Sequence, residues 1–502
     1  MAADKRKASR HTETERKFAV TDATVPPSFA GLSAVASVER LPVQHLEAVY
    51  YDTQDHDLAA HRITLRRRTG GTDAGWHLKL PAGTDSRTEV RAPLGDADGD
   101  TVPYELRDVV LAIVRLRTLQ PVARISTTRT VDMLHDATGA AVAEFCDDVV
   151  TAAAEPDGEP QTWREWELEL AEDADVAPDL LDRLSNRLFD AGAEPAGHGS
   201  KLAKVLDAAR GGSDEQPAAP APASSDAVRR AVAEQVEELL VWDRAVRVDA
   251  WDSVHQMRVV TRKIRSLLQS SEGSFGISDD AWVLDELRLL AGVLGVARDA
   301  EVLAEKYEQA LDGLPDELVR GPIRERLVDG ARSRYQTGWR RSLTAMRSER
   351  YFRLLDALEA LVATQPAPAA PGEDPAPVSI GSAYKRIRKA AKRADTAHDE
   401  DRDEALHRIR KGAKRLRYTA AATGAAKVAD RAKTIQTLLG DHQDAVVSRT
   451  HLSHQAETAH AAGEDTFTYG LLYQQEDDLA QRSRDQLGDA LKQLNRTVRD
   501  KD

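Results

Sequence analysis

The sequence predicts an α+β multidomain protein, with a β-rich N-terminal domain followed by an all-helical, internally duplicated C-terminal domain. Up to about residue 206, charged and apolar residues alternate with the period of two that is typical of strands. From about residue 226 onward, Leu, Val and Ala recur at the three- and four-residue spacing of amphipathic helices. A Pro/Ala/Ser-rich segment separates the two patterns, and a helical motif occurs twice after it.

Length and composition limit the class of protein. The chain has 502 residues, of which 41% are hydrophobic, so it can form several buried cores. Its one cysteine, Cys146, excludes an internal disulfide framework and a zinc site with several thiolates. The sequence contains no run of about 18 apolar residues, so a membrane span is not expected. The first residues lack the apolar stretch of a signal peptide. We therefore expect a cytoplasmic protein.

The average charge of the chain conceals local clusters. A net charge of −14 argues by itself against an anionic ligand. The 69 basic residues are unevenly spread among the 83 acidic ones, however, and several stretches contain no acid at all. The distribution of charge along the chain is therefore more informative than its sum.

The predicted domain boundaries follow the changes in composition. The β-rich domain covers residues 8–206 and the helical domain residues 226–495. Residues 207–225 between them form an extended linker, since Pro, Ala and Ser bury too little apolar surface to fold. A second Pro/Ala stretch joins two helical halves, at about 226–363 and 379–495.

The N-terminal domain begins with a short charged motif, Glu13-x-Glu15-x-Lys17. Residues two apart on a strand share a face, so the three side chains project the same way. Their burial in an apolar core costs several kcal/mol for each charge. They must therefore face either water or a wet, charged cavity.

Later segments repeat this arrangement of charges. One strand face carries charge in each of the sets Arg66 and Arg68; His77 and Lys79; Arg87, Glu89 and Arg91; and Glu165, Glu167 and Glu169. In the last segment the opposite face is apolar, with Trp166, Leu168 and Leu170. A solvated strand face accounts for one such motif, but the recurrence favours a closed or nearly closed antiparallel barrel with a charged lumen.

A lumen with both signs of charge fits a phosphate ligand with a metal ion. Arg and Lys bind phosphate oxygens directly, Arg through its bidentate fork. Carboxylates repel phosphate unless a hard cation such as Mg²⁺ or Mn²⁺ lies between them. Hydrolysis then follows from activation of water and neutralisation of the leaving phosphate.

The Glu13-x-Glu15-x-Lys17 motif and the strands that follow it resemble the CYTH family of triphosphate tunnel metalloenzymes, over about residues 8–206. The resemblance implies an eight-stranded antiparallel tunnel that hydrolyses triphosphates with a divalent metal. It implies catalytic roles for Glu13, Glu15 and Lys17. The phosphate-binding residues that it implies are Arg66, Arg68, Lys79, Arg124, Arg129 and Lys201. The implied metal ligands are Glu13, Glu15, Glu144, Asp148, Glu165 and Glu167.

The helical part contains a basic stripe in two copies. Spacings of three, four and three place each set on one helix face: His255, Arg258, Arg262 and Arg265, and then His407, Arg410, Lys414 and Arg417. A salt-bridged surface would carry interleaved acids, and residues 254–268 and 406–418 contain none. Each stripe is therefore predicted to bind an anion.

A second pair of matching segments follows the stripes in the same order. Residues 294–300 read Leu-Gly-Val-Ala-Arg-Asp-Ala, and residues 439–445 read Leu-Gly-Asp-His-Gln-Asp-Ala. Two matches in register predict that a helical bundle has been duplicated.

A basic stripe is compatible with nucleic acid, acidic lipid or polyphosphate. We see neither the interleaved aromatics nor the recognition module of a nucleic-acid binder, so none is expected. The duplicated motif resembles the CHAD domain over about residues 225–495. The resemblance implies two four-helix bundles with a basic groove that binds inorganic polyphosphate, and it implies no protein partner.

The sequence leads to three hypotheses about function. The first is a metal-dependent inorganic triphosphatase that acts on tripolyphosphate or a related triphosphate, coupled to a polyphosphate-binding module. The second is a non-catalytic protein that binds polyphosphate on granules. The third is thiamine triphosphate hydrolysis or adenylate cyclisation, which the CYTH family also contains. The complete Glu13, Glu15 and Lys17 set favours an enzyme.

Overall fold

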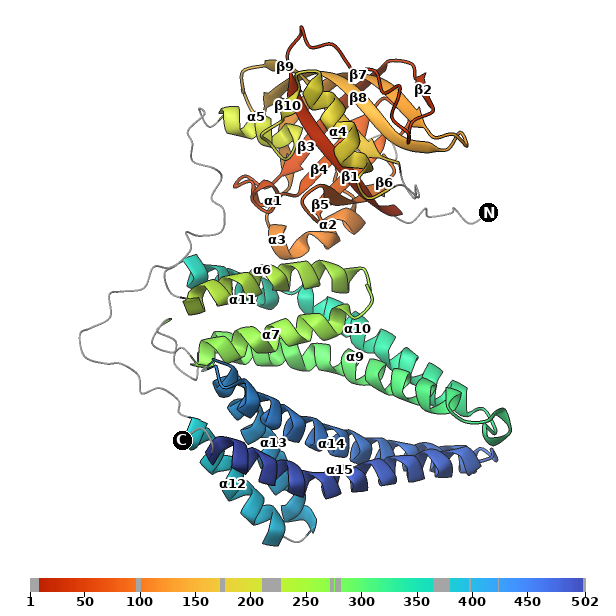
Figure 1. Ribbon diagram of the computed structural model, residues 1–502, viewed down its shortest axis with the longest axis vertical. Coiled ribbons are helices and arrows are strands. Elements are labelled where there is room, and N and C mark those ends of the chain that lie inside the picture. Colours follow the sequence, from red (N-terminus) through yellow and green to blue (C-terminus); the bar gives the residue numbers. More distant parts are fainter. Residues whose placement is uncertain are drawn as a thin grey trace, which may run out of the picture. The chain divides into compact units, whose positions relative to one another are not determined.

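The computed structural model is shown in Figure 1. It describes residues 9–95, 101–171, 177–209, 227–270, 275, 281–363, 380–396, 399–422 and 424–499. Most of the predicted linker and of the second Pro/Ala stretch lies outside the described residues. The chain divides into two compact units. The first unit comprises Met1–Ser274, Ser278–Arg288 and Leu343–Gln365, and the second comprises Phe275–Ile277, Leu289–Ser342 and Pro366–Asp502.

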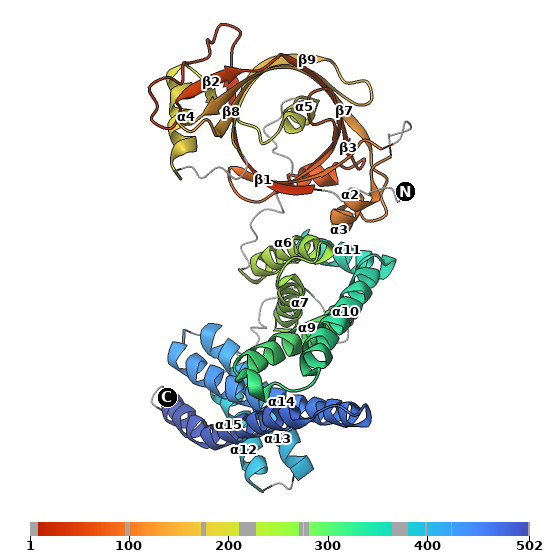
Figure 2. The same cartoon turned by 90° about the vertical axis from the view of Figure 1, so that its right-hand side faces the viewer.

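The N-terminal region forms a closed antiparallel barrel of eight strands, which confirms the predicted fold. Around the barrel the order is β1 (Ser9–Val20), β6 (Ser86–Ala92), β5 (Gly75–Pro81), β4 (Thr64–Thr69), β3 (Gln44–Asp52), β7 (Gln120–His135), β8 (Ala141–Ala154) and β9 (Gln161–Leu170). Strand β9 pairs back with β1 and closes the ring, which Figure 2 shows end-on. Two short strands add to its edges, β2 (Ser37–Arg40) on β7 and β10 (Glu194–Pro195) on β1.

Strand β1 makes the closure by dividing its length between two neighbours. Residues 9–14 pair with β6, and residues 15–20 pair with β9. The register places Glu13 opposite Arg87 and Glu15 opposite Glu169. The predicted charged motif therefore lies at the position where the barrel closes.

The outer face of the barrel is apolar, as the alternation of residues predicts. On one side it is covered by helix α4 (Leu180–Asp190), whose Leu184 and Leu188 are fully buried. The strand residues in this cluster include Phe18, Leu134, Phe145, Trp166 and Leu168, with Leu170 partly buried beside them. Phe145 and Trp166 contact edge to face with ring centroids 5.5 Å apart, a favourable aromatic geometry.

Helix α5 (Lys201–Ala209) fills one end of the barrel. Its residues Leu202, Val205 and Leu206 are buried against inward-facing side chains of β3, β7 and β8, which include Tyr50, Ile125 and Val150. In Figure 2 this helix is seen inside the ring of strands. The barrel therefore has an apolar floor beneath its charged part.

The first unit also contains helices from both sides of residues 210–226. Those from the N-terminal side are α1 (Asp57–Ala60), α2 (Tyr104–Val109) and α3 (Leu111–Val114); those from the other side are α6 (Ala227–Arg247), α7 (Ser253–Ser270), the start of α9 (Trp282–Asp312) and α11 (Glu349–Ala363).

Ion pairs connect α2 and α3 to the later helices of the unit. Asp108 accepts hydrogen bonds from Arg347 at 2.8 Å and from the buried Arg247 at 3.3 Å. Arg247 also donates to Asp243 at 2.6 Å. Arg115 pairs with Asp356 and Glu359.

The second unit is helical. It contains most of α9, the 3₁₀ turn η1 (Asp316–Leu318), the π turn η2 (Glu325–Asp329), most of α10 (Gly330–Met346), α12 (Ile380–Thr396), α13 (Asp399–Ala422), α14 (Ala426–Ala461) and α15 (Phe467–Arg499). Ile387, Ile409, Ile435 and Leu494 form a core shared by α12 to α15.

The second pair of matching segments lies on corresponding helix faces. Leu294, Ala297 and Ala300 are buried on α9. The aligned Leu439, His442 and Ala445 are buried on α14. The same three positions therefore face a core in both copies, which supports duplication of the helical motif.

In the described parts of the chain, every helix is either too short or too polar to cross a membrane.

We predict that Asp108→Ala lowers the free energy of unfolding by about 2–3 kcal/mol, because it leaves the buried Arg247 with one carboxylate partner fewer and releases Arg347. Urea unfolding of the full chain measures the change. Asp132→Ala is the control, since its partner Arg40 has a side chain that is 65% exposed. Equal effects of the two substitutions would contradict the prediction.

Candidate active site

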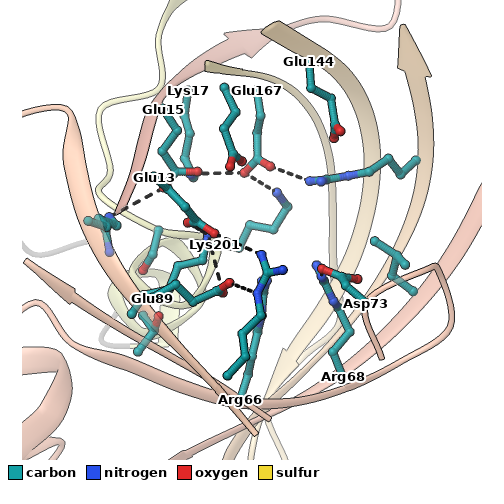
Figure 3. Close-up of a pocket in the computed structure, with 18 of the residues that line it drawn as sticks. Glu13, Glu15, Lys17, Arg66, Arg68, Asp73, Glu89, Glu144, Glu167 and Lys201 are labelled. Carbon is teal, nitrogen blue, oxygen red and sulfur yellow. Dashed lines mark hydrogen bonds and ion pairs between the residues drawn. The ribbon is translucent and has the colours of Figure 1, made fainter. Parts of the chain in front are cut away.

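The barrel encloses a charged cavity of about 370 Å³. Eight basic and seven acidic side chains line it, together with a few apolar and hydroxyl groups. Figure 3 shows these side chains converging from strands on all sides of the lumen. The predicted charged lumen is thus confirmed, and its two signs of charge nearly balance.

Three carboxylates gather near the closure of the barrel. One oxygen from each of Glu13, Glu15 and Glu169 lies within 4.8 Å of the other two. Burial and the neighbouring Glu13 raise the pKa of Glu169 to about 7. Burial opposes ionisation of Glu15 as well, but Lys17 and Lys79 outweigh it and lower its pKa to about 2. The negative charge around Glu169 is therefore not fully neutralised by neighbouring cations. The cluster offers only oxygen donors, which suit a hard divalent cation.

A second carboxylate cluster already contains a cationic side chain. The Lys201 ammonium lies 2.8 Å from Asp148, 2.8 Å from Glu165 and 2.7 Å from Glu167. Arg129 donates to Asp148 at 2.7 and 2.8 Å and also contacts Glu167. Burial opposes ionisation of Glu167, yet these cations and Lys17 hold its pKa well below the usual range. The negative charge of this cluster is therefore neutralised by cationic side chains of the protein.

A third cluster joins histidine to carboxylates. The His11 ring lies 3.2 Å from both Glu13 and Glu89. His77 Nδ1 lies 2.9 Å from Glu89, and Arg91 also contacts Glu89. Burial lowers the pKa of His77 to about 4, so its ring is neutral at pH 7. Glu89 thus holds His11, His77 and Arg91 together in the wall of the lumen.

Two arginines on β4 differ from the other lumen cations. Lys17, Lys79, Arg87, Arg91, Arg129 and Lys201 each form an ion pair with a strand carboxylate. Within the described part of the chain, Arg66 has no such pair, and its hydrogen bond goes to the Tyr50 hydroxyl at 3.3 Å. Among the residues that the structure describes, Arg68 pairs with Asp73 alone, from the loop between β4 and β5 (Figure 3). These two guanidinium groups are the ones best placed to receive an anion.

Most of the residues predicted for this site come together. The cavity is lined by Glu13, Glu15, Lys17, Arg66, Arg68, Lys79, Arg129, Glu144, Glu167 and Lys201. Asp148 and Glu165 contact Lys201 from the wall of the barrel and are almost fully buried.

The expectation that Arg124 joins the lumen is wrong. Its side chain is 62% exposed and pairs with Glu155 at 2.6 Å. Arg124 and Arg129 are five positions apart on β7, so they point to opposite faces of the strand.

Glu169 and the set Arg87, Glu89 and Arg91 lie in the lumen, as the alternation of charges predicts, although the sequence assigned them no catalytic, phosphate-binding or metal-binding role. Asp73 was not predicted, because it lies in a loop, where no periodicity indicates the direction of a side chain.

The basic stripes lie away from the apolar cores of their helices. On α7, Val254, Met257 and Ile264 are buried, whereas the stripe residues His255, Arg258, Arg262 and Arg265 are exposed or half-buried. On α13, Ile409, Ala413 and Leu416 are buried, whereas the stripe residues His407, Arg410, Lys414 and Arg417 are exposed or half-buried. The two helices belong to different units.

Comparison with family models identifies the two halves of the chain. Residues 11–187 match the CYTH domain, and residues 230–453 match the CHAD domain. The chain therefore belongs to the CYTH and CHAD families, in that order along the sequence. CYTH domains are triphosphate tunnel metalloenzymes that generally depend on a metal ion.

Several proteins are similar to the whole of this chain or to part of it. Uncharacterized proteins from Mycobacterium tuberculosis strains CDC 1551 and H37Rv are each 64% identical over 98% of both chains. A solved CHAD domain from the plant Ricinus communis is 23% identical, covering 54% of this chain and 92% of its own, with a TM-score of 0.38. A putative adenylyl cyclase from Hippeastrum, with a dominant triphosphatase activity, is 18% identical; it covers 39% of this chain and 96% of its own, with a TM-score of 0.24.

We predict that Glu169→Gln weakens Mn²⁺ binding to the full chain by more than about tenfold, since even outer-shell changes at metal sites cost that much. Glu165→Gln should have a smaller effect, because Lys201 already compensates its cluster. Electron paramagnetic resonance of free Mn²⁺ measures both affinities. Glu47→Gln, on the exposed face of β3, is the control. The reverse order of the two effects would contradict the assignment.

Proposed function

We propose that residues 8–206 form a metal-dependent inorganic triphosphatase and that residues 226–495 form a polyphosphate-binding module. The enzyme would hydrolyse a phosphoanhydride bond of tripolyphosphate or a related triphosphate. The observation that carries this proposal is a single lumen in which the Glu13, Glu15 and Glu169 cluster lies near basic side chains that include Arg66 and Arg68.

The residues of the first cluster fit a divalent metal ion. Glu13, Glu15 and Glu169 offer hard oxygen donors close to one another, which suits Mg²⁺ or Mn²⁺. A cation bound there would neutralise charge on the phosphate and activate water. Glu144 lines the same cavity. Asp148, Glu165 and Glu167 remain candidate ligands, for which a metal would have to compete with Lys201.

The basic side chains of the lumen would hold and orient the phosphate chain. Arg66 and Arg68 present guanidinium groups whose fork matches phosphate oxygens. Tyr50 fixes the position of Arg66 through its hydroxyl. Lys79 and Lys17 add positive charge at the carboxylate cluster, where they pair with Glu13 and Glu15. Groups aligned before the substrate arrives stabilise the charge that develops in the transition state.

An inorganic chain suits this cavity better than a nucleotide. Tyr50 is the single aromatic side chain in the described lining, and its hydroxyl is bonded to Arg66. No aromatic platform for a purine or a thiazole is present among the lining residues. Adenylate cyclisation and thiamine triphosphate hydrolysis are therefore the less favoured activities.

A non-catalytic granule protein is the second candidate. Its tunnel would bind phosphate chains without turnover, and the CHAD domain would attach it to polyphosphate granules in the cytoplasm. The complete set of Glu13, Glu15 and Lys17 favours activity, because a lumen that only binds anions gains nothing from buried acids.

The stripes on α7 and α13 support the binding role of the helical part. Each presents four basic or histidine side chains on one helix face, outside the apolar core. Linear polyphosphate carries regularly spaced negative charge, which such a row can match.

The chain with Mg²⁺ or Mn²⁺ is expected to release phosphate from tripolyphosphate faster than from ATP or thiamine triphosphate. Glu15→Gln should reduce this release at least about 100-fold, since it removes a carboxylate from the metal cluster. Colorimetric phosphate determination measures the rates, with Glu47→Gln as the control. Absence of release from all three compounds, with polyphosphate binding retained, would leave the non-catalytic function.

Reversal of charge at Arg410, Lys414 and Arg417 to Glu should weaken binding of long-chain polyphosphate by the full chain more than about tenfold, because three favourable charges become repulsive. Isothermal titration with EDTA and excess tripolyphosphate, which occupies the tunnel, measures the affinity. The matched control reverses the exposed Lys427, Arg431 and Lys433 on α14. Equal losses in both variants would refute a specific stripe.

A further inference from the structure

The loop between β4 and β5 brings a carboxylate to the open end of the barrel. Asp73 lines the cavity together with Thr72 of the same loop, and its side chain is 31% exposed. In Figure 3 its carboxylate lies directly beside the Arg68 guanidinium. Gly70 and Gly71 have φ of +79° and +71°, and a Cβ at Gly70 would lie 2.0 Å from the His45 carbonyl oxygen. The path of the loop is therefore closely defined.

Asp73 differs from the other acids of the lumen in its origin and its partner. Every other acidic residue in the lining projects from a strand. Among the described residues Asp73 joins none of the carboxylate clusters, and its ion pair is with Arg68. Its backbone carbonyl accepts a hydrogen bond from His77 Nε2 at 2.9 Å, which ties the loop to β5.

The surroundings of the Arg68 guanidinium favour a bound anion. Its side chain is 8% exposed, and its buried Nε has no hydrogen-bond partner in the part of the chain that the structure describes. Burial and the neighbouring Arg66 and Arg129 lower its pKa to about 9. A carboxylate at this position relieves repulsion among the three guanidinium groups, as a phosphate would.

We propose that Asp73 is an internal counter-anion, which binds Arg68 in the empty tunnel and must yield that guanidinium to a phosphate of the entering substrate. This inference rests on the proposed triphosphatase function and assigns a residue that sets substrate affinity. The Asp73 carboxylate and a substrate phosphate compete for the same N–H donors of the Arg68 guanidinium. The affinity of the protein for the phosphate chain is therefore reduced by the strength of the Arg68–Asp73 pair. Partial exposure of Asp73 lets it turn to water when it is displaced.

The test is Asp73→Asn, which removes the charge and keeps the shape of the side chain. We expect the KM for tripolyphosphate with Mg²⁺ to fall about three- to fivefold, with kcat changed less than about twofold. Binding of tripolyphosphate in EDTA, measured by calorimetry, should tighten by the same factor. Asp73→Glu keeps the charge and should restore values near those of the unsubstituted chain.

The control is Asp132→Asn, which breaks an Asp–Arg pair on the outside of the barrel. If the unsubstituted chain hydrolyses tripolyphosphate and Asp73→Asn leaves KM and binding unchanged or weaker, the counter-anion role is wrong and the triphosphatase stands. A raised Mg²⁺ requirement in Asp73→Asn would identify Asp73 as a metal-linked residue and overturn the proposal. If the unsubstituted chain neither binds nor hydrolyses tripolyphosphate, the proposed function fails first and this inference fails with it.

Discussion

The pairing of β1 with both β6 and β9 is the constraint on which the rest of the N-terminal structure depends. One strand of 12 residues supplies six to each neighbour, so the barrel closes within the length of β1. The same register puts Glu15 opposite Glu169 and Lys17 opposite Glu167. A slip of one residue would turn every one of these side chains to the other face. The strand register that closes the barrel therefore also assembles the carboxylate cluster.

A barrel with a charged interior is stable only if the charges compensate one another, because each isolated buried charge costs several kcal/mol. Lys201 fulfils this condition for three carboxylates, and Glu89 fulfils it for Arg91 and Lys79. Where compensation is incomplete, the lumen has capacity for a ligand. Glu169 retains its proton up to about pH 7, and Arg66 pairs with no carboxylate among the described residues. The sites of expected cation and anion binding are therefore the imperfectly balanced ones.

Strand periodicity made the barrel and most of its lumen predictable, because residues two apart share a face whatever the tertiary context. Arg124 was misplaced because its strand is long and the resemblance alone supplied its direction, against the odd spacing from Arg129. Helix α5 and Asp73 could not be assigned, since a short amphipathic helix and a loop carry no signal of what they contact. The helical stripes were predictable within each helix. Their arrangement in space depends on the packing of helices far apart in sequence, which no local pattern encodes.

The apolar floor made by α5 bears on the end of the barrel through which a phosphate chain would enter. Leu202 and Val205 pack against inward-facing strand residues at one end of the barrel, and the neighbouring Lys201 contributes a cation to the lining of the cavity. Under the proposed function, a phosphate polymer longer than the cavity would enter by its terminus from the end opposite α5. Such entry would bring the terminal phosphates of the polymer to the carboxylate cluster before any internal phosphate.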